Sequence, residues 1–353
     1  MSKKKPVIII DAMGGDFAPG ITVDGTCQMA AESNAHFIMV GDEAKIKAEL
    51  EKHTHNKDQF SIVHTDEEIT MEDSPRKAIR EKKNASVLLA ARMLKEGKGD
   101  AMVSAGSTAA VILAASLYIK RIPGVKRAAI GTIFPTLKED RKASLYSVIM
   151  DVGANINNTP DDLVHYAYMG KTYLEEVFDF DNPSIALLNI GAEEHKGNDT
   201  MKAAYKILKS RADLNFIGNI EGNDITNGKS DVIVSEGMLG NVAMKSVEGA
   251  GESVKRLAEI AMKGKLVWKL GLLLLSGGIK KLMKVASYEE YGGAPIFGFD
   301  KLVVKNHGRC NAYAYKNGLR TALKAVEMNM IGFMRDSISK FESDKEKGTT
   351  QES

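Results

Sequence analysis

The residues Val7-Ile8-Ile9-Ile10-Asp11-Ala12-Met13-Gly14-Gly15-Asp16 are the clearest indication of the fold. A short apolar run of this kind is typical of a strand buried on both faces of a parallel sheet. The two glycines after Asp11 predict a tight turn at the carboxyl end of that strand, and open α/β sheets bind their ligands at this edge. The segment therefore predicts an α/β fold with a candidate site at Asp11, Gly14 and Gly15. A simple turn capped by an aspartate explains the same residues equally well.

Along the rest of the chain, short apolar or β-branched runs alternate with longer stretches of helical periodicity. This alternation predicts an α/β fold with a large, mostly parallel sheet and helices on both faces. The predicted strands are residues 7–10, 37–40, 60–64, 101–104, 128–134, 147–152, 185–190, 215–220, 232–235 and 302–305.

Two helices have clear start and stop signals. Ser74 and Pro75 predict the first turn of one long basic helix over Arg76–Glu96, which Gly97 ends. A second helix is expected over 199–211, where apolar residues recur at helical spacing.

No linker rich in Pro, Gly or Ser divides the chain. We therefore expect a single α/β domain over residues 1–341, with a helical excursion at about 242–290. Residues 342–353 are polar and poor in apolar side chains, which predicts a disordered tail.

Charge and cysteine content narrow the classes of function. The 353 residues include 48 Lys and Arg against 46 Asp and Glu, a formal net charge of +2, so no overall positive field would attract nucleic acid. Cys27 and Cys310 are too few for a disulfide framework and lack the paired spacing of a zinc site. We expect a cytoplasmic protein that uses no metal and no cofactor.

The segment Ser104-Ala105-Gly106-Ser107 joins a predicted strand to an apolar helix. Small residues at such a turn expose backbone N–H groups at a helix N-terminus, where the helix dipole favours an anion such as phosphate. Ser104, Gly106 and Ser107 are therefore candidate phosphate-binding residues. A cap of small residues that permits close helix packing is the alternative.

Three further strand ends carry polar side chains: Lys196 in the loop 189–198, Asn219 after the next strand and Asn241 after the one beyond. A lysine suits a phosphate or a developing oxyanion, and asparagines are neutral donors for a tetrahedral intermediate. Surface lysines are usually only solvated, and asparagine beside glycine is usually turn chemistry. We expect these strand ends to meet the first two along one edge of the sheet. His307, after the last strand, is a weaker binding candidate that could equally be structural.

The stretch from 262 to 286 combines lysines with large apolar residues and contains no acidic residue. On a helix Lys265, Lys269, Lys280 and Lys284 share one face, which is typical of a helix lying on an anionic membrane surface. The pair Gly277-Gly278 favours a helical hairpin over one continuous helix. A dimerisation or core helix is an equal alternative, and the basic face could also receive an acidic carrier protein. The contact candidates are Lys269, Leu272, Leu275, Ile279, Lys280 and Lys284.

Taken together, the motifs resemble the bacterial phosphate acyltransferase family, which makes acyl phosphates for phospholipid synthesis. The resemblance covers nearly the whole chain, and the motifs occur in the same order. The segments that carry it are IDAMGGD (10–16), SPRKAIREKKNAS (74–86), SAGSTAA (104–110), DVGAN (151–155), LLNIGAEEHKGN (187–198), FIGNIEGNDI (216–225), EGMLGNVAMKSVEG (236–249) and EYGGAPIFG (290–298).

The resemblance implies a Rossmann-like three-layer fold and a homodimer with its site near the subunit interface. It implies acyl carrier protein thioester and inorganic phosphate as substrates, peripheral membrane association, and transfer of the product to a membrane-bound glycerol-phosphate acyltransferase. Lys196 and Asn241 match the positions we assign to catalysis, with Asp11 in support, and Asn155 in DVGAN joins the binding candidates.

The sequence departs from the family pattern in three places, which puts direct roles for residues 107 and 309–310 in doubt. Ser107 and Ala109 stand where Asn and Gly are common, Ser235-Glu236 precedes Gly237 in place of a segment ending in Asp, and Arg309-Cys310 replaces a serine pair. Two other functions remain open at this point: a nicotinamide-dependent decarboxylating dehydrogenase, and a membrane-recruited scaffold for a carrier protein. The first would need clustered aspartates for a metal and arginines for a dicarboxylate, and we locate neither.

Overall fold

The computed structural model describes residues 5–136, 146–263, 271, 274–275 and 292–351. Its strands are β1 (Val7–Asp11), β2 (His36–Gly41), β3 (Phe60–His64), β4 (Ala101–Ser104), β5 (Ala129–Pro135), β6 (Tyr146–Met150), β7 (Ser184–Leu188), β8 (Asn215–Ile220), β9 (Val232–Val234), β10 (Ala294–Phe297) and β11 (Leu302–Lys305). Its helices are α1 (Gly20–Ala30), α2 (Glu43–Leu50), α3 (Pro75–Glu81), α4 (Ser86–Lys95), α5 (Thr108–Tyr118), α6 (Pro160–Phe178), α7 (Asp199–Lys209), α8 (Gly222–Asn227), α9 (Gly237–Lys263), α12 (Ala312–Glu327) and α13 (Met330–Gln351), with a short 3-10 turn η1 (Lys57–Gln59).

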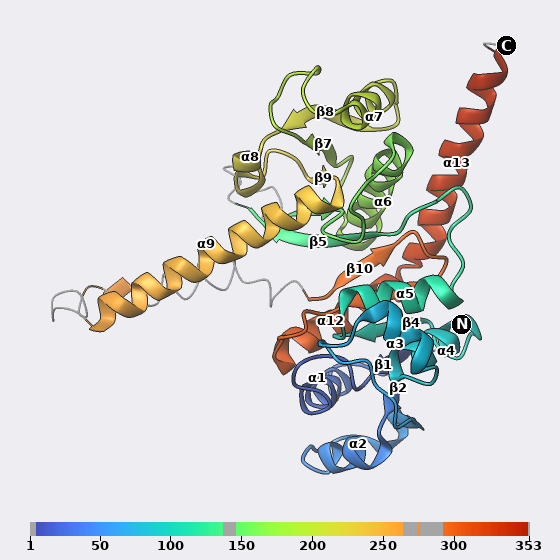
Figure 1. Ribbon diagram of the computed structural model, residues 1–353, viewed down its shortest axis with the longest axis vertical. Coiled ribbons are helices and arrows are strands. Elements are labelled where there is room, and N and C mark those ends of the chain that lie inside the picture. Colours follow the sequence, from blue (N-terminus) through green and yellow to red (C-terminus); the bar gives the residue numbers. More distant parts are fainter. Residues whose placement is uncertain (1–4, 137–145, 264–270, 272–273, 276–291, 352–353) are drawn as a thin grey trace.

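Within the described residues the strands form one sheet of eleven, in the order β3-β2-β1-β4-β11-β10-β5-β6-β9-β7-β8. Successive residues of β1 point to opposite faces, so Ile8 and Ile10 enter one apolar core and Ile9 enters the other. Residues of α1, α6 and α12 pack into the first core, and residues of α4 and α5 pack into the second. The predicted mostly parallel sheet between two helical layers is confirmed (Figure 1).

The strands run in two opposite directions, which separates the strand ends that the sequence singled out. Strands β3, β2, β1, β4 and β11 are mutually parallel. Strand β10 is antiparallel to both β11 and β5, and β5 is antiparallel to β6. Strands β6, β9, β7 and β8 therefore point opposite to the first set. The expectation that all the polar strand ends share one edge is wrong, because these antiparallel pairs reverse the chain direction in the middle of the sheet.

The long helix predicted over Arg76–Glu96 is two helices, α3 and α4. The chain turns between them at Lys82–Ala85, where the backbone N–H of Asn84 donates to Glu67 Oε2 at 2.8 Å. This turn lets Ser86 begin α4 at the end of β1. A polar hydrogen bond across the fold thus overrides the continuous helical periodicity of the sequence.

The C-terminal segment differs from expectation, and the helical excursion is only partly described. Helix α13 continues to Gln351, so the segment expected to be a disordered tail is helical. Helix α9 leaves the body of the molecule as a long arm (Figure 1). Most of the excursion beyond Lys263 lies outside the described residues. In the part of the chain that is described, no helix has the length and apolar character needed to cross a membrane.

Candidate functional site

Asp11 lies buried at the end of β1, with both carboxylate oxygens bound by serines. Ser86 Oγ donates to Oδ1 at 2.6 Å, and Ser104 Oγ donates to Oδ2 at 2.6 Å. Ser104 Oγ in turn accepts from the backbone N–H of Gly106 at 3.0 Å. Burial raises the pKa of Asp11, and the serine hydrogen bonds oppose that rise. Asp11, predicted as a supporting catalytic group, thus connects β1, β4, α4 and the start of α5.

The backbone of the glycine turn after β1 lies close to this carboxylate. A Cβ added to Gly14 would lie 2.5 Å from Asp11 Oδ2, 2.7 Å from the Gly106 nitrogen and 2.9 Å from Ser104 Oγ. A side chain at position 14 would therefore push the turn away from the α5 N-terminus. The absence of a Cβ brings the backbone of Gly14 beside that of Gly106, which are two of the predicted phosphate-binding positions.

The end of β11 adds Lys305, which we did not single out from the sequence. In the strand register Lys305 is the partner of Ser104, and Ser104 is also the partner of Asp11. The Lys305 ammonium group donates to the Asn306 carbonyl and, at 3.4 Å, to the Ala105 carbonyl. Burial lowers the pKa of Lys305 to about 8. The signal in the sequence that could have indicated this residue is a lysine at the end of the apolar run Leu302–Lys305.

His307 follows Lys305 at the surface of the same strand end. Partial burial, together with the nearby Lys305 charge, lowers the pKa of His307. Glu248 and Lys245 of α9 also interact electrostatically with this imidazole, in opposite directions. The charges of Lys245 and Glu248 on α9 therefore lie within electrostatic range of His307.

The loop that carries Lys196 is held by asparagines at the ends of β7 and β8. Asn189 Nδ2 donates to the carbonyl of Lys196 at 3.1 Å, and Asn219 Nδ2 donates to the carbonyl of Glu193 at 2.8 Å. Asn198 Nδ2 donates to Glu236 Oε2 at 3.0 Å, which ties the loop to the residue before α9. Lys196 is half-buried. Asn219, predicted as a ligand, uses its amide donor to position this loop.

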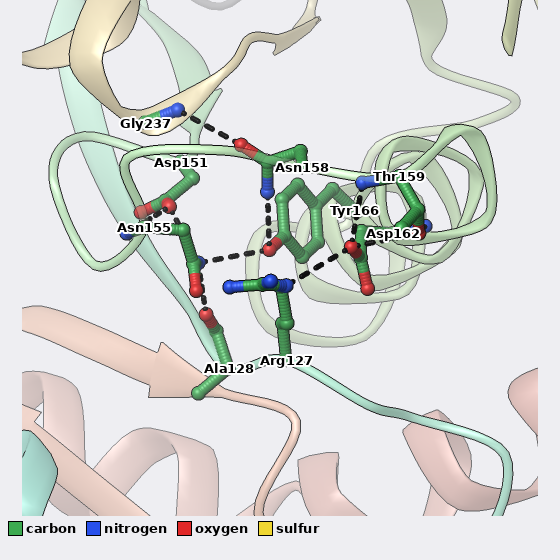
Figure 2. A network of polar contacts seen from close by, with 9 residues as sticks. All are labelled: Arg127, Ala128, Asp151, Asn155, Asn158, Thr159, Asp162, Tyr166 and Gly237. Carbon is green, nitrogen blue, oxygen red and sulfur yellow. Dashed lines mark hydrogen bonds and ion pairs between the residues drawn. The ribbon is translucent and has the colours of Figure 1, made fainter. Parts of the chain in front are cut away.

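A buried polar network links the turn after β6 to Gly237, the first residue of α9 (Figure 2). Asp151 accepts from the backbone N–H of Ala154 at 2.9 Å and from Asn155 Nδ2 at 2.8 Å. Asn155 and Asn158 both donate to the Tyr166 hydroxyl, at 2.9 and 3.0 Å, and Asn158 Oδ1 accepts from the backbone N–H of Gly237 at 3.3 Å. Burial raises the pKa of Asp151. Asn155, another predicted ligand, is thus engaged within the protein.

Helix α9 connects the two groups of residues. A Cβ added to Gly153, in the turn after β6, would lie 3.4 Å from the Asn241 side chain. Lys245 and Glu248 follow Asn241 at the fourth and seventh positions, on the same side of the helix, and both act on His307. The structure therefore places the candidates in two groups, one at β1, β4 and β11 and one at β7 and β8, with the base of α9 between them.

The remaining predicted residues are only partly described. Ser107 precedes α5 and its side chain makes no cap hydrogen bond. Leu275 is 62% exposed. The other predicted contact residues, Lys269, Leu272, Ile279, Lys280 and Lys284, lie outside the described residues. Among the residues that are described, no group of His, Cys, Asp and Glu could hold a metal ion.

Comparison with known proteins shows the family. The family described as "Fatty acid synthesis protein" matches residues 7–332. The phosphate acyltransferase of Dictyoglomus turgidum is 43% identical over 334 residues, covering 94% of this chain and 98% of that protein. The chain belongs to the phosphate acyltransferase family. The phosphate acyltransferase of Clostridium beijerinckii is 39% identical, again over 94% of this chain and 98% of the relative.

Solved structures of lower identity share the fold. A phosphotransacetylase from Streptococcus pyogenes superposes with a TM-score of 0.61 at 19% identity, covering 92% of this chain and 95% of that one. The EutD phosphotransacetylase from Staphylococcus aureus gives a TM-score of 0.54 at 16% identity, over 93% and 95% of the two chains. Family membership makes this chain an acyltransferase, as the resemblance implied. The dehydrogenase and scaffold alternatives find no support among its phosphate acyltransferase relatives.

Proposed function

We propose that this phosphate acyltransferase takes its acyl group from an acyl carrier protein thioester and passes it to inorganic phosphate. A phosphate oxygen forms a bond to the thioester carbonyl carbon, and the carbon–sulfur bond then breaks. The products are acyl phosphate and the carrier thiolate, which takes up a proton. Because phosphate is already a nucleophile and a thiol with pKa near 8.5 is a tolerable leaving group, positioning and oxyanion stabilisation suffice.

One observation carries the proposal: the family match covers residues 7–332, a range that includes all the segments that build the two groups of residues. The close approach of the glycine turn to Gly106 supports phosphate binding at the α5 N-terminus. Lys196, which belongs to the second group, is the cation proposed to hold the same phosphate. Asn241 and a glycine N–H are the proposed donors to the tetrahedral oxyanion. Asp11 supports this arrangement indirectly, because it accepts a hydrogen bond from Ser104, which in turn accepts one from the Gly106 N–H.

We propose a homodimer in the cytoplasm that touches the membrane peripherally and hands its acyl phosphate to a membrane-bound glycerol-phosphate acyltransferase, toward phosphatidic acid and phospholipids. The α9 arm supports both contacts, because Val254, Leu257 and Ile260 are each more than half exposed. Light scattering tests the dimer, and flotation with anionic phospholipid vesicles tests membrane contact.

The deciding assay incubates the protein with acyl carrier protein thioester, with and without phosphate, and measures free carrier thiol. Release that requires phosphate and ignores added nicotinamide cofactor supports the proposal. Thiol release without phosphate, or no release at all, overturns it.

A further inference from the structure

The buried carboxylate of Asp151 is surrounded by donors from the chain near it. Oδ1 accepts from the backbone N–H groups of Ile130, Gly153 and Ala154, at 3.1, 3.2 and 2.9 Å. Oδ2 accepts from the backbone N–H and the side-chain amide of Asn155, at 3.0 and 2.8 Å. A carboxylate without exposed surface is costly unless its oxygens are hydrogen-bonded, so these bonds hold the turn after β6 in one conformation.

The first turn of α9 packs directly on this turn. A Cβ added to Gly237 would overlap the Asn155 carbonyl oxygen. A Cβ added to Gly240 would overlap the Asp151 carbonyl oxygen, which also accepts from Ser235 Oγ at 3.0 Å. A side chain at either glycine would force the two segments apart. The backbone at the base of α9 is therefore seated on the backbone that Asp151 holds.

Asn241, the proposed oxyanion donor, lies one turn into α9 and contacts the same turn. A Cβ added to Gly153 would lie 3.4 Å from Asn241 Cβ and Cγ and 3.5 Å from its Oδ1. Gly153 has a φ of +122°, which other residues rarely adopt, and its N–H is bound by Asp151. The Asp151 carboxylate is thus linked to the Asn241 side chain through one residue, Gly153.

We propose that Asp151 is a positioning residue for the reaction: by fixing the turn that carries Gly153, it sets the place of the Asn241 amide. This inference rests on the proposed function, in which Asn241 donates to the tetrahedral oxyanion. Such a donor acts only within about 3 Å of the developing charge, so a displacement of about 1 Å removes much of its effect. Because α9 extends from the body as a long arm, the contacts at its base are the ones that can fix Asn241 (Figure 1).

The first test is Asp151→Asn, which keeps the size of the side chain but replaces one acceptor oxygen with a donor. Its matched control is Asp231→Asn, just before β9 at the strand end opposite to α9. There a half-buried carboxylate accepts from the N–H and the hydroxyl of Ser184, at 2.8 and 2.6 Å. Phosphate-dependent thiol release is measured below the melting temperature of each variant.

We expect Asp151→Asn to lower kcat by about tenfold to a hundredfold. KM for phosphate should stay unchanged, since Asn241 acts on the oxyanion and not on phosphate. Asp231→Asn should keep the wild-type kcat, even if it is less stable. Far-UV circular dichroism checks that each variant is folded.

A double-mutant cycle with Asn241→Ala separates positioning from a general structural role. If Asp151 acts through Asn241, Asp151→Asn should have little further effect on kcat once Asn241→Ala is present. A merely structural effect would instead multiply with the loss from Asn241→Ala. If Asp151→Asn does not fold, Gly153→Ala takes its place in the cycle, because it disturbs the turn where that turn contacts Asn241.

Two results would overturn the positioning role. One is a wild-type kcat in the folded Asp151→Asn variant or in its substitute Gly153→Ala. The other is a pair of losses that multiply independently in the cycle. A wild-type enzyme that releases no thiol in the presence of phosphate, or an Asn241→Ala variant with full rate, would instead contradict the proposed function itself, so the two failures are distinguishable.

Discussion

Lys305 lies beside Ser104 in the register of β11 and β4, and its ammonium group is buried at the strand end that holds the Asp11 carboxylate. Because burial lowers the pKa of Lys305 from its ordinary 10.5 to about 8, the unfolded chain keeps this proton in a pH range where the folded protein has lost it. Stability gains from this group as pH rises from about 8 to 10.5.

The gain from Lys305 across that window is on the order of 3 kcal/mol. We expect the Lys305→Met variant to lack this part of the rise, whatever its absolute stability. Urea unfolding of both proteins at a series of pH values measures the difference. Parallel curves for the two proteins would show that Lys305 keeps an ordinary pKa.

Lys196→Ala should abolish acyl phosphate formation, because it removes the cation proposed to hold phosphate or the developing oxyanion. We expect a loss of roughly a hundredfold or more in kcat. The fold should remain, since the loop is held by Asn189 and Asn219 and by the Lys196 backbone, not by the lysine side chain. Lys202→Ala, a substitution in the following helix, is the control and should keep full rate. Near-wild-type turnover in Lys196→Ala would remove this residue from catalysis.

Gly14→Ala should both destabilise the protein and reduce its activity. The added methyl group would lie 2.5 Å from Asp11 Oδ2, so the turn must shift, at a cost of about 1–3 kcal/mol. Gly249→Ala in α9 is the matched control, because a Cβ there meets nothing within 4 Å and alanine favours a helix. Thermal unfolding compares the two variants. An unchanged melting temperature for Gly14→Ala would show that the turn is less tightly packed than described.

Tyr166→Phe should destabilise the protein by about 1–3 kcal/mol, because Asn155 and Asn158 would each lose an acceptor in a buried place. Tyr173→Phe is a control of equal burial, since its hydroxyl has no hydrogen-bond partner in the described part of the chain. Removing that hydroxyl should cost little or even stabilise the protein. Equal losses of unfolding free energy in the two variants would mean that the network in Figure 2 contributes nothing specific.

Much of the fold could be predicted from the sequence, because strand burial and helix caps are local properties. The apolar runs at 7–10 and 302–305 both proved to be strands, and Pro75 does begin a helix. The division of the following helix at Lys82–Ala85 could not be predicted, because it depends on contacts with Glu67 and Asp11 that are distant in the sequence. The helical tail was missed because its composition alone is that of an unstructured segment.

The candidate site could also be predicted from the sequence only in part. Chemistry-bearing residue types at strand ends, such as Asp11, Lys196 and Asn241, were visible in the sequence, because a strand followed by glycine and a polar group has a local signature. Lys305 escaped notice, since only the register of β11 against β4 brings it beside Ser104.

The sequence alone was therefore enough for the α/β class, the family and the list of polar strand ends, each of which depends on short-range pattern. Only the tertiary structure decided which of these ends lie together. Strand direction is set by which strands pair, and the antiparallel pairs made by β10 and by β5 with β6 divide the ends into two groups. The base of α9 joins those groups, because its Asn241 side packs on the turn after β6 while Lys245 and Glu248 act on His307.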